Sequence, residues 1–508
     1  MNTILEQYKD KINGTFSFFD RMIIKGHIRQ FFSPSGKKFF LSERNILLKD
    51  FSAYANQVTH DIVSYVETFT CSQNRPLVYL SSAKTSKEQT ALDILRNDPV
   101  EDGLICTLSV VECCQTMMPK KKQNGLLDLA TVNRKCKYYY FYFMDKHFGF
   151  MHVKLQTWFP FLIQVYINGR EMMKHIFDQN GITYRMHDNS FSEISDIDRA
   201  QELADKFDSK SLCRQLDLFA HKVNPYLDTI EDIFHQGYHW CVDQCEYATD
   251  VMFKSREALE DIYPSLVGHA FYDFKCTDVF SFLGRKLDKK FLGEAVSDYR
   301  KRPEGWRIKF KMKSNSIKMY DKFNCLRIEM TINDPKEFKV YKDVRHRDGT
   351  YSRRWVPMGK SIANLYRYAE ISKAANKRFL YSMHDIVPEK SIEKEINGVC
   401  GRKTVKNRTF TGFNVWSAET FRLFETISDG RYLIRGFTNR DIRRRLYPDL
   451  PDEETCGKTS RIFAKLRAHG LIRKIPHSRR YLVSSKGRRI MGALIETKRR
   501  TYPELAAN

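Results

Sequence analysis

Residues 316–332 have the sequence SIKMYDKFNCLRIEMTI, and this stretch decides the fold of the middle of the chain. Two strand-like runs, 316–322 and 325–332, are separated by residues 323–324 alone, so the spacing predicts an antiparallel hairpin with these two residues as its turn. The register follows by counting and gives five pairs: Lys322 with Cys325, Tyr320 with Arg327, Met319 with Ile328, Lys318 with Glu329 and Ile317 with Met330.

In this register one face of the hairpin is apolar and the other carries Lys318, Tyr320, Arg327 and Glu329. The agreement between register and face supports the pairing, because a shift by one residue would turn every side chain to the other face. A tyrosine, a carboxylate and two cations are therefore predicted to meet on one surface. A salt-bridged, exposed sheet face is the alternative interpretation.

The string Tyr-Asp-Lys at 320–322, followed by Arg-x-Glu at 327–329, resembles the strand pair of rolling-circle replication initiators. In that family a tyrosine attacks a DNA phosphate near a carboxylate-bound metal. The resemblance implies that Tyr320 is the nucleophile and that Glu329 is a metal ligand or orients one. It also implies that Lys318 or Arg327 stabilises the phosphate.

The strand before the hairpin alternates cations with apolar residues: Arg307, Lys309, Lys311 and Lys313 alternate with Ile308, Phe310 and Met312. Side chains two residues apart in a strand share a face, so the four cations form a row. Such a row could follow a phosphate backbone. A solvated edge that protects the sheet from aggregation is the other interpretation.

Acidic residues suggest where a metal could bind. The segment 238–253 is compatible with strand or helix, and if it is helical, Asp243, Glu246 and Asp250 are neighbours that could hold Mg²⁺ or Mn²⁺; a solvated helix face is the alternative. Zinc is less expected, because the string His235-x3-His239-x-Cys241-x3-Cys245 matches no common zinc module. Three further carboxylates lie beside strand-like segments, where nucleases often place metal ligands: Asp20, Glu112 and Asp145.

The rest of the chain alternates strand-like and helix-like segments, which predicts a multidomain α/β (α+β) protein. We expect a mixed α/β domain at 1–196 and a central domain of helices and antiparallel sheet at 197–393. A basic linker is expected at 394–412 and a helix-turn-helix unit at 413–508.

The C-terminal segment predicts helices at 417–428, 439–446 and 457–469, then a basic hairpin at 471–483 and a last helix from about 485. Thr438 and Asp441 have the spacing of a helix cap, and Gly470 is a suitable helix stop. Between residues 431 and 500 there are 20 Lys and Arg against 6 Asp and Glu. Clustered positive charge of this kind is typical of DNA-binding domains.

The strings LRAHGLIRK at 466–474, RYLV at 480–483 and Lys486-Gly487 resemble the recognition helix and wing of winged helix-turn-helix proteins, including MarR-like members. The resemblance covers about residues 413–498. It implies that the third helix enters the major groove and that the hairpin contacts the backbone or minor groove. The residues implied as nucleic-acid contacts are Lys458, Arg461, Lys465, Arg473, Lys474, Arg479 and Arg480. A winged helix used for protein contacts is the alternative.

Composition agrees with a polyanionic partner: the 508-residue chain has 85 Lys and Arg against 61 Asp and Glu, a net charge of +24. No run of apolar residues is long enough to predict a membrane span. The first residues lack the apolar core of a signal peptide, and the 12 Cys are scattered, so we expect a reducing cytoplasm. Motifs of ATPases, dehydrogenases, serine hydrolases and zincins are absent.

Three segments resemble a large bacterial family of mobile-element-like proteins, some described as MarR-type regulators: FFDRMIIKG at 18–26, residues 148–161, and LRIEMTIN at 326–333. The sequence therefore predicts a cytoplasmic DNA-binding protein of a mobile or replicating element, with metal-dependent phosphodiester cleavage as its candidate activity. A non-enzymatic regulator is the alternative. RNA binding through the strands 138–142 and 307–313 is a further alternative.

Overall fold

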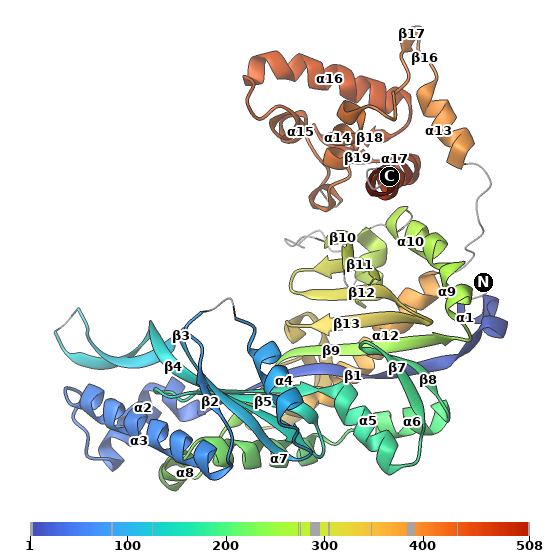
Figure 1. Cartoon of the computed structure of the whole chain (residues 1–508). Coiled ribbons are helices and arrows are strands. Elements are labelled where there is room, and N and C mark those ends of the chain that lie inside the picture. The colour runs from blue at the N-terminus through green and yellow to red at the C-terminus, as the bar shows by residue number, and fades with distance from the viewer. Residues whose placement is uncertain are drawn as a thin grey trace.

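The computed structural model describes residues 4–82, 85–123, 125–272, 274, 276–284, 295–302, 305–346, 348–383, 392–433 and 435–505 (Figure 1). It is a mixed α/β structure, as the sequence predicts, and it is organised around one large sheet. Among the described residues, no helix combines the length and apolarity needed to cross a membrane.

The large sheet has eleven strands in the order β10-β11-β12-β13-β9-β1-β6-β5-β4-β3-β2. All neighbouring strands are antiparallel except β2 and β3, which are parallel. The strand bounds are β1 Ile12–His27, β2 Leu77–Tyr79, β3 Gly103–Lys121, β4 Leu127–Asp145, β5 Gly149–Gln156, β6 Ile163–Asn168, β9 His239–Phe253, β10 Ala295–Arg302, β11 Gly305–Met312, β12 Asn315–Lys322 and β13 Cys325–Ile332.

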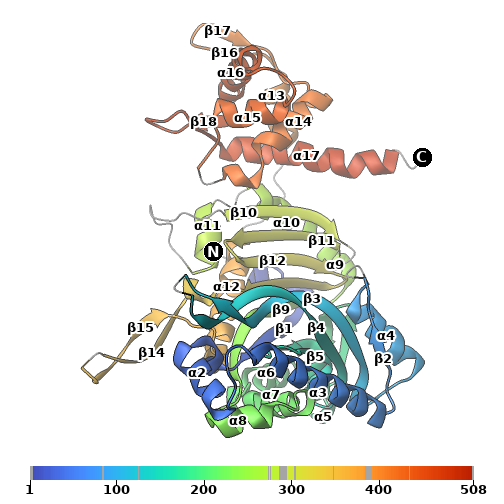
Figure 2. The same ribbon diagram turned by 90° about the vertical axis from the view of Figure 1, so that its left-hand side faces the viewer.

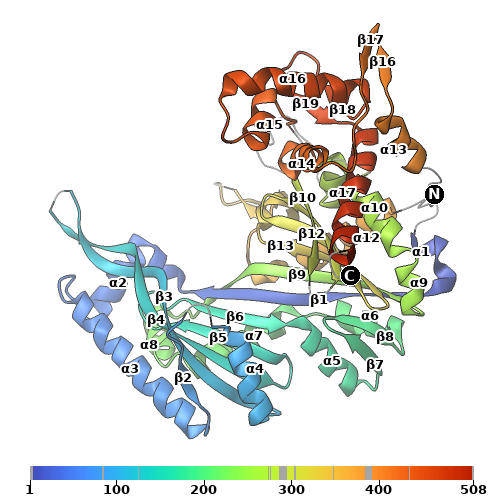
Figure 3. The same cartoon turned by 45° about the horizontal axis from the view of Figure 1, so that its top comes forward.

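The long strands β1 and β9 pair along the middle of the sheet and run through the body of the molecule (Figure 3). They join strands of the predicted N-terminal domain to strands of the predicted central domain. Residues 1–196 and 197–393 therefore share one sheet and one main core. The segment 239–253 is a strand, which settles the ambiguity between helix and strand. It lies between two other strands in a largely buried position, where the polar–apolar alternation of a half-exposed strand is weak.

The hairpin that the sequence predicts at 316–332 is formed by β12 and β13. Its register agrees with the prediction at all five pairs, including Tyr320 with Arg327 and Lys318 with Glu329. The turn residue Phe323 has a positive φ of 58°, as tight hairpin turns require. The apolar face of the hairpin packs into the main core, which α12 covers.

Helices cover both faces of the sheet. On the core side lie α2 Pro34–Glu43, α3 Phe51–Ser72, α7 Ser209–Val223, α8 Leu227–Phe234, α10 Tyr263–Tyr272, α11 Cys276–Phe282 and α12 Leu365–Ser382. The opposite face carries α4 Lys87–Asn97 at one end, and α5 Gly169–Gln179, α6 Ile197–Asp205 and the small sheet β7 Tyr184–His187 with β8 Ser190–Ile194 near its middle. The short helices are α1 Ile4–Gln7 and α9 Arg256–Glu260.

Besides β7–β8, three other two-stranded ribbons lie outside the large sheet. They are β14 Lys339–Arg345 with β15 Tyr351–Pro357, β16 Lys403–Val405 with β17 Arg408–Phe410, and β18 Ile472–Lys474 with β19 Tyr481–Val483. The segment 394–412, which the sequence predicts to be a linker, thus contains β16–β17 and most of α13 Ile392–Cys400. Val399 of α13 packs into the C-terminal core.

The C-terminal elements are α14 Ala418–Ile427, α15 Asn439–Leu446, α16 Asp452–Ala468, the β18–β19 ribbon and α17 Ser485–Leu505. Their order, three helices, a hairpin and a helix, agrees with the predicted elements. Thr438 and Asp441 form the expected capping box at the start of α15. A separate hydrophobic core holds these elements together.

Candidate functional site

The polar face of the β12–β13 hairpin lies inside the protein. Lys318, Tyr320, Arg327 and Glu329 are all buried, and the Arg327 side chain is fully enclosed. The structure therefore brings the four predicted catalytic residues together. Their burial contradicts the alternative of an exposed salt-bridged sheet face.

The neighbouring strands β9 and β1 add three buried carboxylates to this face. Asp250 accepts from the Arg327 guanidinium at 2.9 Å, and Asp20 lies 2.9 Å from the same group. Glu246 lies four residues before Asp250 on β9 and forms an ion pair with Arg21 at 2.7 Å. We call Asp20, Glu246, Asp250, Glu329, Lys318 and Arg327 the buried charge cluster.

Lys318 connects two of the carboxylates. Its Nζ donates to Glu329 Oε1 at 2.5 Å and lies 3.5 Å from Glu246 Oε1. Burial acts to raise the pKa of Glu246, but Lys318 and Arg21 outweigh it and hold that pKa at about 2. Glu246 is therefore an anion at neutral pH, and it keeps Lys318 charged in spite of its burial.

A β-bulge places Asp20 in the cluster. The pairing of β1 with β9 moves from Phe19–Tyr247 directly to Arg21–Glu246, so Asp20 has no partner across the ladder. Bulges of this kind redirect a side chain and are frequent beside active sites. Gly169 at the start of α5 packs against the bulge so closely that a Cβ there would lie 1.8 Å from the Phe19 carbonyl oxygen.

The pKa values of Asp250 and of the neighbouring Tyr320 are both raised. Burial raises the pKa of Asp250 to about 6, although Arg327 and the backbone N–H of Phe191 act to lower it. Burial and the nearby Glu329 raise the pKa of Tyr320 well above its ordinary value. Tyr320 is therefore a neutral phenol at pH 7, and a nearby base would have to take its proton before it could act as a nucleophile.

Three of the carboxylates could share a metal ion. One oxygen from each of Asp20, Glu246 and Glu329 lies within 4.8 Å of the other two. Carboxylate oxygens are the ligands that Mg²⁺ and Mn²⁺ prefer. Two of these carboxylates already have cationic partners: Lys318 pairs with Glu329, and Arg327 pairs with Asp20.

The predicted cation row lies on β11, directly beside the hairpin. Arg307 pairs with Tyr320, and Lys309 pairs with Lys318. The apolar residues between the cations are buried, which confirms the predicted alternation of the two faces. Lys311 is exposed, whereas Lys313, at the end of the row, forms an ion pair with Glu337 at 2.6 Å.

The prediction that Asp243 joins Glu246 and Asp250 is wrong, because it assumed a helix. In the strand β9 the pairing skips Asp243, and its side chain forms ion pairs with Lys25 at 2.8 Å and Lys360 at 3.1 Å. These three residues line a separate cavity of about 500 Å³. Glu246 and Asp250 share a face because they are four residues apart in a strand.

Two other predicted carboxylates lie outside the cluster. Glu112 forms ion pairs with Lys154 at 2.6 Å and Lys87 at 3.2 Å. Asp145 accepts from two backbone N–H groups in the β4–β5 turn. Both therefore have local structural roles.

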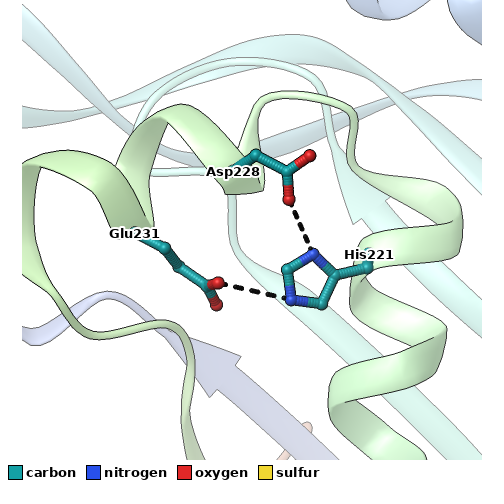
Figure 4. A group of neighbouring side chains, drawn as sticks. All are labelled: His221, Asp228 and Glu231. Carbon is teal, nitrogen blue, oxygen red and sulfur yellow. Dashed lines mark hydrogen bonds and ion pairs between the residues drawn. The ribbon is translucent and has the colours of Figure 1, made fainter.

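The residues of the zinc-type string have different surroundings in the structure. His239 packs against His27 and is bonded to Arg29, whereas Cys245 is buried in the main core. A different group, which sequence reasoning missed, lies on α7 and α8: His221 contacts Asp228 at 2.9 Å and Glu231 at 3.4 Å (Figure 4). Its Asp228 side chain is 80% exposed, so the contacts are those of a surface ion pair.

The predicted aromatic surface for RNA is not exposed. Tyr138, Tyr140 and Tyr142 of β4 are buried against the α4 side of the sheet. Their rings are therefore not available to stack on bases.

The predicted C-terminal contacts divide into two groups. Lys458 and Arg461 on α16, and Arg473, Lys474 and Arg479 on the hairpin, are exposed. Lys465 instead lies 4.2 Å from the centre of the Phe413 ring and is partly buried. Arg480 donates to the carbonyl oxygens of Arg435 and Gly436, which anchors the hairpin. Lys465 and Arg480 are therefore largely engaged within the protein.

Two cations of the site were missed from the sequence. Arg21 pairs with Glu246, and Arg170 lies 3.5 Å from Asp20. The only signal for Arg21 was its place next to Asp20, and nothing in the sequence links Arg170 to the hairpin.

Comparison of this chain with protein-family models, curated proteins and solved structures finds no match.

Proposed function

We propose that this protein binds the DNA of a mobile or replicating element and cleaves a phosphodiester bond at the buried charge cluster with Mg²⁺ or Mn²⁺. The observation that carries the proposal is the convergence of Asp20, Glu246 and Glu329, with oxygens within 4.8 Å, beside Lys318 and Tyr320. Three carboxylates, a cation and a possible nucleophile are the groups that metal-assisted phosphoryl transfer uses.

In this proposal each group has a separate role. Asp20, Glu246 and Glu329 would hold the metal ion, which would supply Lewis-acid activation of the phosphate. Lys318 neutralises charge on the phosphate oxygens. The Tyr320 oxygen attacks phosphorus after giving its proton to a carboxylate, the bond from phosphorus to the sugar oxygen breaks, and that oxygen takes a proton as it leaves. The product is a phosphodiester between Tyr320 and the DNA.

The C-terminal elements support DNA binding in the manner of a winged helix. The three helices are followed by a hairpin, and α16 presents Lys458 and Arg461 to solvent. Docking of α16 in the major groove would place Arg473, Lys474 and Arg479 of the hairpin near the backbone.

The first experiment tests cleavage. Purified protein is incubated with labelled single-stranded and double-stranded DNA and with Mg²⁺ or Mn²⁺, and covalent adducts are sought by denaturing gel electrophoresis. We expect Glu329→Gln to abolish cleavage and Tyr320→Phe to abolish both cleavage and the adduct. Cleavage that persists in Tyr320→Phe would refute Tyr320 as the nucleophile but would still agree with the metal site.

A second experiment tests docking. The double variant Lys458→Ala, Arg461→Ala should weaken duplex binding strongly, whereas Lys465→Ala should have a smaller effect because Lys465 packs on Phe413. Equal affinities for wild type and the double variant would contradict the winged-helix assignment.

A non-enzymatic regulator or nucleoprotein scaffold is the second candidate function. It is favoured by the burial of Tyr320, which is 6% exposed, and by the cationic partners of the cluster carboxylates. DNA binding without cleavage at any metal concentration would select this function. A discrete RNA that co-purifies with the protein would instead select an RNA-binding role.

A further inference from the structure

The β14–β15 ribbon is a two-stranded arm that projects from the body of the molecule (Figure 2). Its strands pair over seven residues each, from Lys339–Pro357 at the root to Arg345–Tyr351 near the tip. The root is fixed in the core, since Phe338, Val340 and Met358 are buried. The arm is therefore a defined element with a firm base and solvent on both of its faces.

The arm is strongly basic. Residues 339–357 include six Lys and Arg and two Asp. On one face Lys342 lies directly opposite Arg354 in the register. Like charges in this position repel each other and destabilise a hairpin, and an anion between them would remove that cost. Within the described part of the chain, neither side chain has a carboxylate at ion-pair distance.

The other face of the arm carries two aromatic rings, and one cation lies over each ring. Tyr341 and Trp355 contact each other at 5.4 Å between ring centres. Arg353 lies over Tyr341 at 5.6 Å, and Arg367 of α12 lies over Trp355 at 5.2 Å. Both guanidinium groups also have a carboxylate nearby, since Arg353 lies 3.9 Å from Asp343 and Arg367 lies 2.8 Å from Glu370. Tyr341 and Trp355 are 45% and 54% exposed, so the cation pair of the opposite face, rather than ring burial, is what favours an anionic partner.

Size and charge together select the partner. Seven residues per strand give an arm of roughly 23 Å. The major groove of B-form DNA, about 12 Å wide, accepts a two-stranded ribbon, whereas the major groove of duplex RNA is too narrow and deep. We propose that the β14–β15 arm binds duplex DNA by entering its major groove, with Lys342 and Arg354 of one face and Arg345 of the other contacting phosphates.

This inference rests on the proposed DNA binding but assigns a contact outside both α16 and the buried charge cluster. The test uses the full-length protein and a fluorescein-labelled DNA duplex of about 30 base pairs and mixed sequence, roughly three helical turns. Binding is measured by fluorescence anisotropy over a range of salt concentrations. The arm variant is Lys342→Ala, Arg345→Ala, Arg354→Ala. A matched control neutralises three exposed lysines on other elements, Lys146, Lys206 and Lys210.

The logarithm of the binding constant decreases linearly with the logarithm of salt concentration. We expect the magnitude of this slope to be smaller by about 2 to 3 in the arm variant, close to 0.9 for each lost phosphate contact. The control should leave the slope within about 0.5 of wild type. An arm variant with the same loss for single-stranded DNA or duplex RNA of equal length would overturn the assignment to the groove of duplex DNA.

Failure of this inference can be distinguished from failure of the proposed function. Wild-type protein that binds no duplex would refute DNA binding as a whole. Wild type that binds, with an unchanged slope in the arm variant, would refute the arm alone. A wild-type dimer that becomes monomeric in Tyr351→Ala, Trp355→Ala by sedimentation velocity would show that the exposed rings, 69% and 54% exposed, serve self-association, and would also overturn the proposal.

Discussion

Replacing Arg327 with methionine tests the most buried charge in the site. The guanidinium is fully enclosed and faces two carboxylates, Asp20 and Asp250, each at 2.9 Å. Methionine keeps much of the aliphatic volume but removes this cation from both carboxylates, which leaves Asp20 only the more distant Arg170 at 3.5 Å. Removing one partner of a buried ion pair costs about 3 to 5 kcal/mol. Because two carboxylates lose a partner, we expect a loss of about 4 kcal/mol or more, measured by urea unfolding.

The loss should depend on the charge of Asp250. Adding Asp250→Asn to Arg327→Met removes one stranded anion, so the double variant should recover about 1 to 3 kcal/mol. Arg327→Lys keeps the charge but loses the second ion pair, and it should lie between wild type and methionine. As a control, Arg353→Met breaks an exposed pair with Asp343 and should change stability by less than about 0.5 kcal/mol. A double variant no more stable than Arg327→Met would refute the reasoning that stranded charge causes the loss.

Three further predictions concern the same site. Lys318→Met should increase the affinity for Mn²⁺, measured by calorimetry, because it removes the cation that competes for Glu329 and Glu246; unchanged or absent Mn²⁺ binding would contradict the metal site. Gly169→Ala should lower stability by about 1 to 3 kcal/mol through its clash at the β1 bulge, whereas Gly398→Ala in α13, with open space around it, should be neutral or stabilising in thermal unfolding. The pKa of Glu246 is depressed to about 2, so the ionised carboxylate contributes about 3 kcal/mol to the free energy of unfolding. This contribution is present above pH 4.5 and is lost as the pH falls towards 2. The difference in unfolding free energy between wild type and Glu246→Gln should therefore shrink over that window, and a constant difference would contradict the depressed pKa.

Local patterns predicted the hairpin well because turn length and face alternation depend on neighbouring residues only. The pairs Tyr320–Arg327 and Lys318–Glu329 follow from a two-residue turn, and the structure confirms them. The segment around Asp243 was harder, because β9 lies between two other strands and is largely buried, which weakens the polar–apolar alternation that identifies a strand. Its assumed helical spacing therefore grouped the wrong carboxylate with Glu246.

The position of Asp20 could not be predicted from one sequence. Its partner Arg327 is 307 residues away, and the contact depends on a bulge that one strand makes against another. The sequence placed Asp20 only beside a strand, together with Glu112 and Asp145, which have other partners. The pairing of distant strands decides which of these three carboxylates lies in the site. The spacing of polar and apolar residues along the sequence does not report how distant strands pair.

The energetics of the buried charge cluster agree better with the proposed metal site than with a role in stability alone. Taking four carboxylates and two cations out of water is costly, and well-packed apolar residues of the same volume often stabilise a core as much or more. A bulge and a glycine contact bring Asp20 within reach of the cluster, and bulges are frequent beside active sites. Carboxylates held close together against their mutual repulsion are instead the arrangement that a divalent cation and a phosphate would stabilise on binding. On this reasoning the cluster should gain stability when Mn²⁺ binds, and Asp20→Asn should reduce that gain more than Asp145→Asn, whose carboxylate lies in a surface turn.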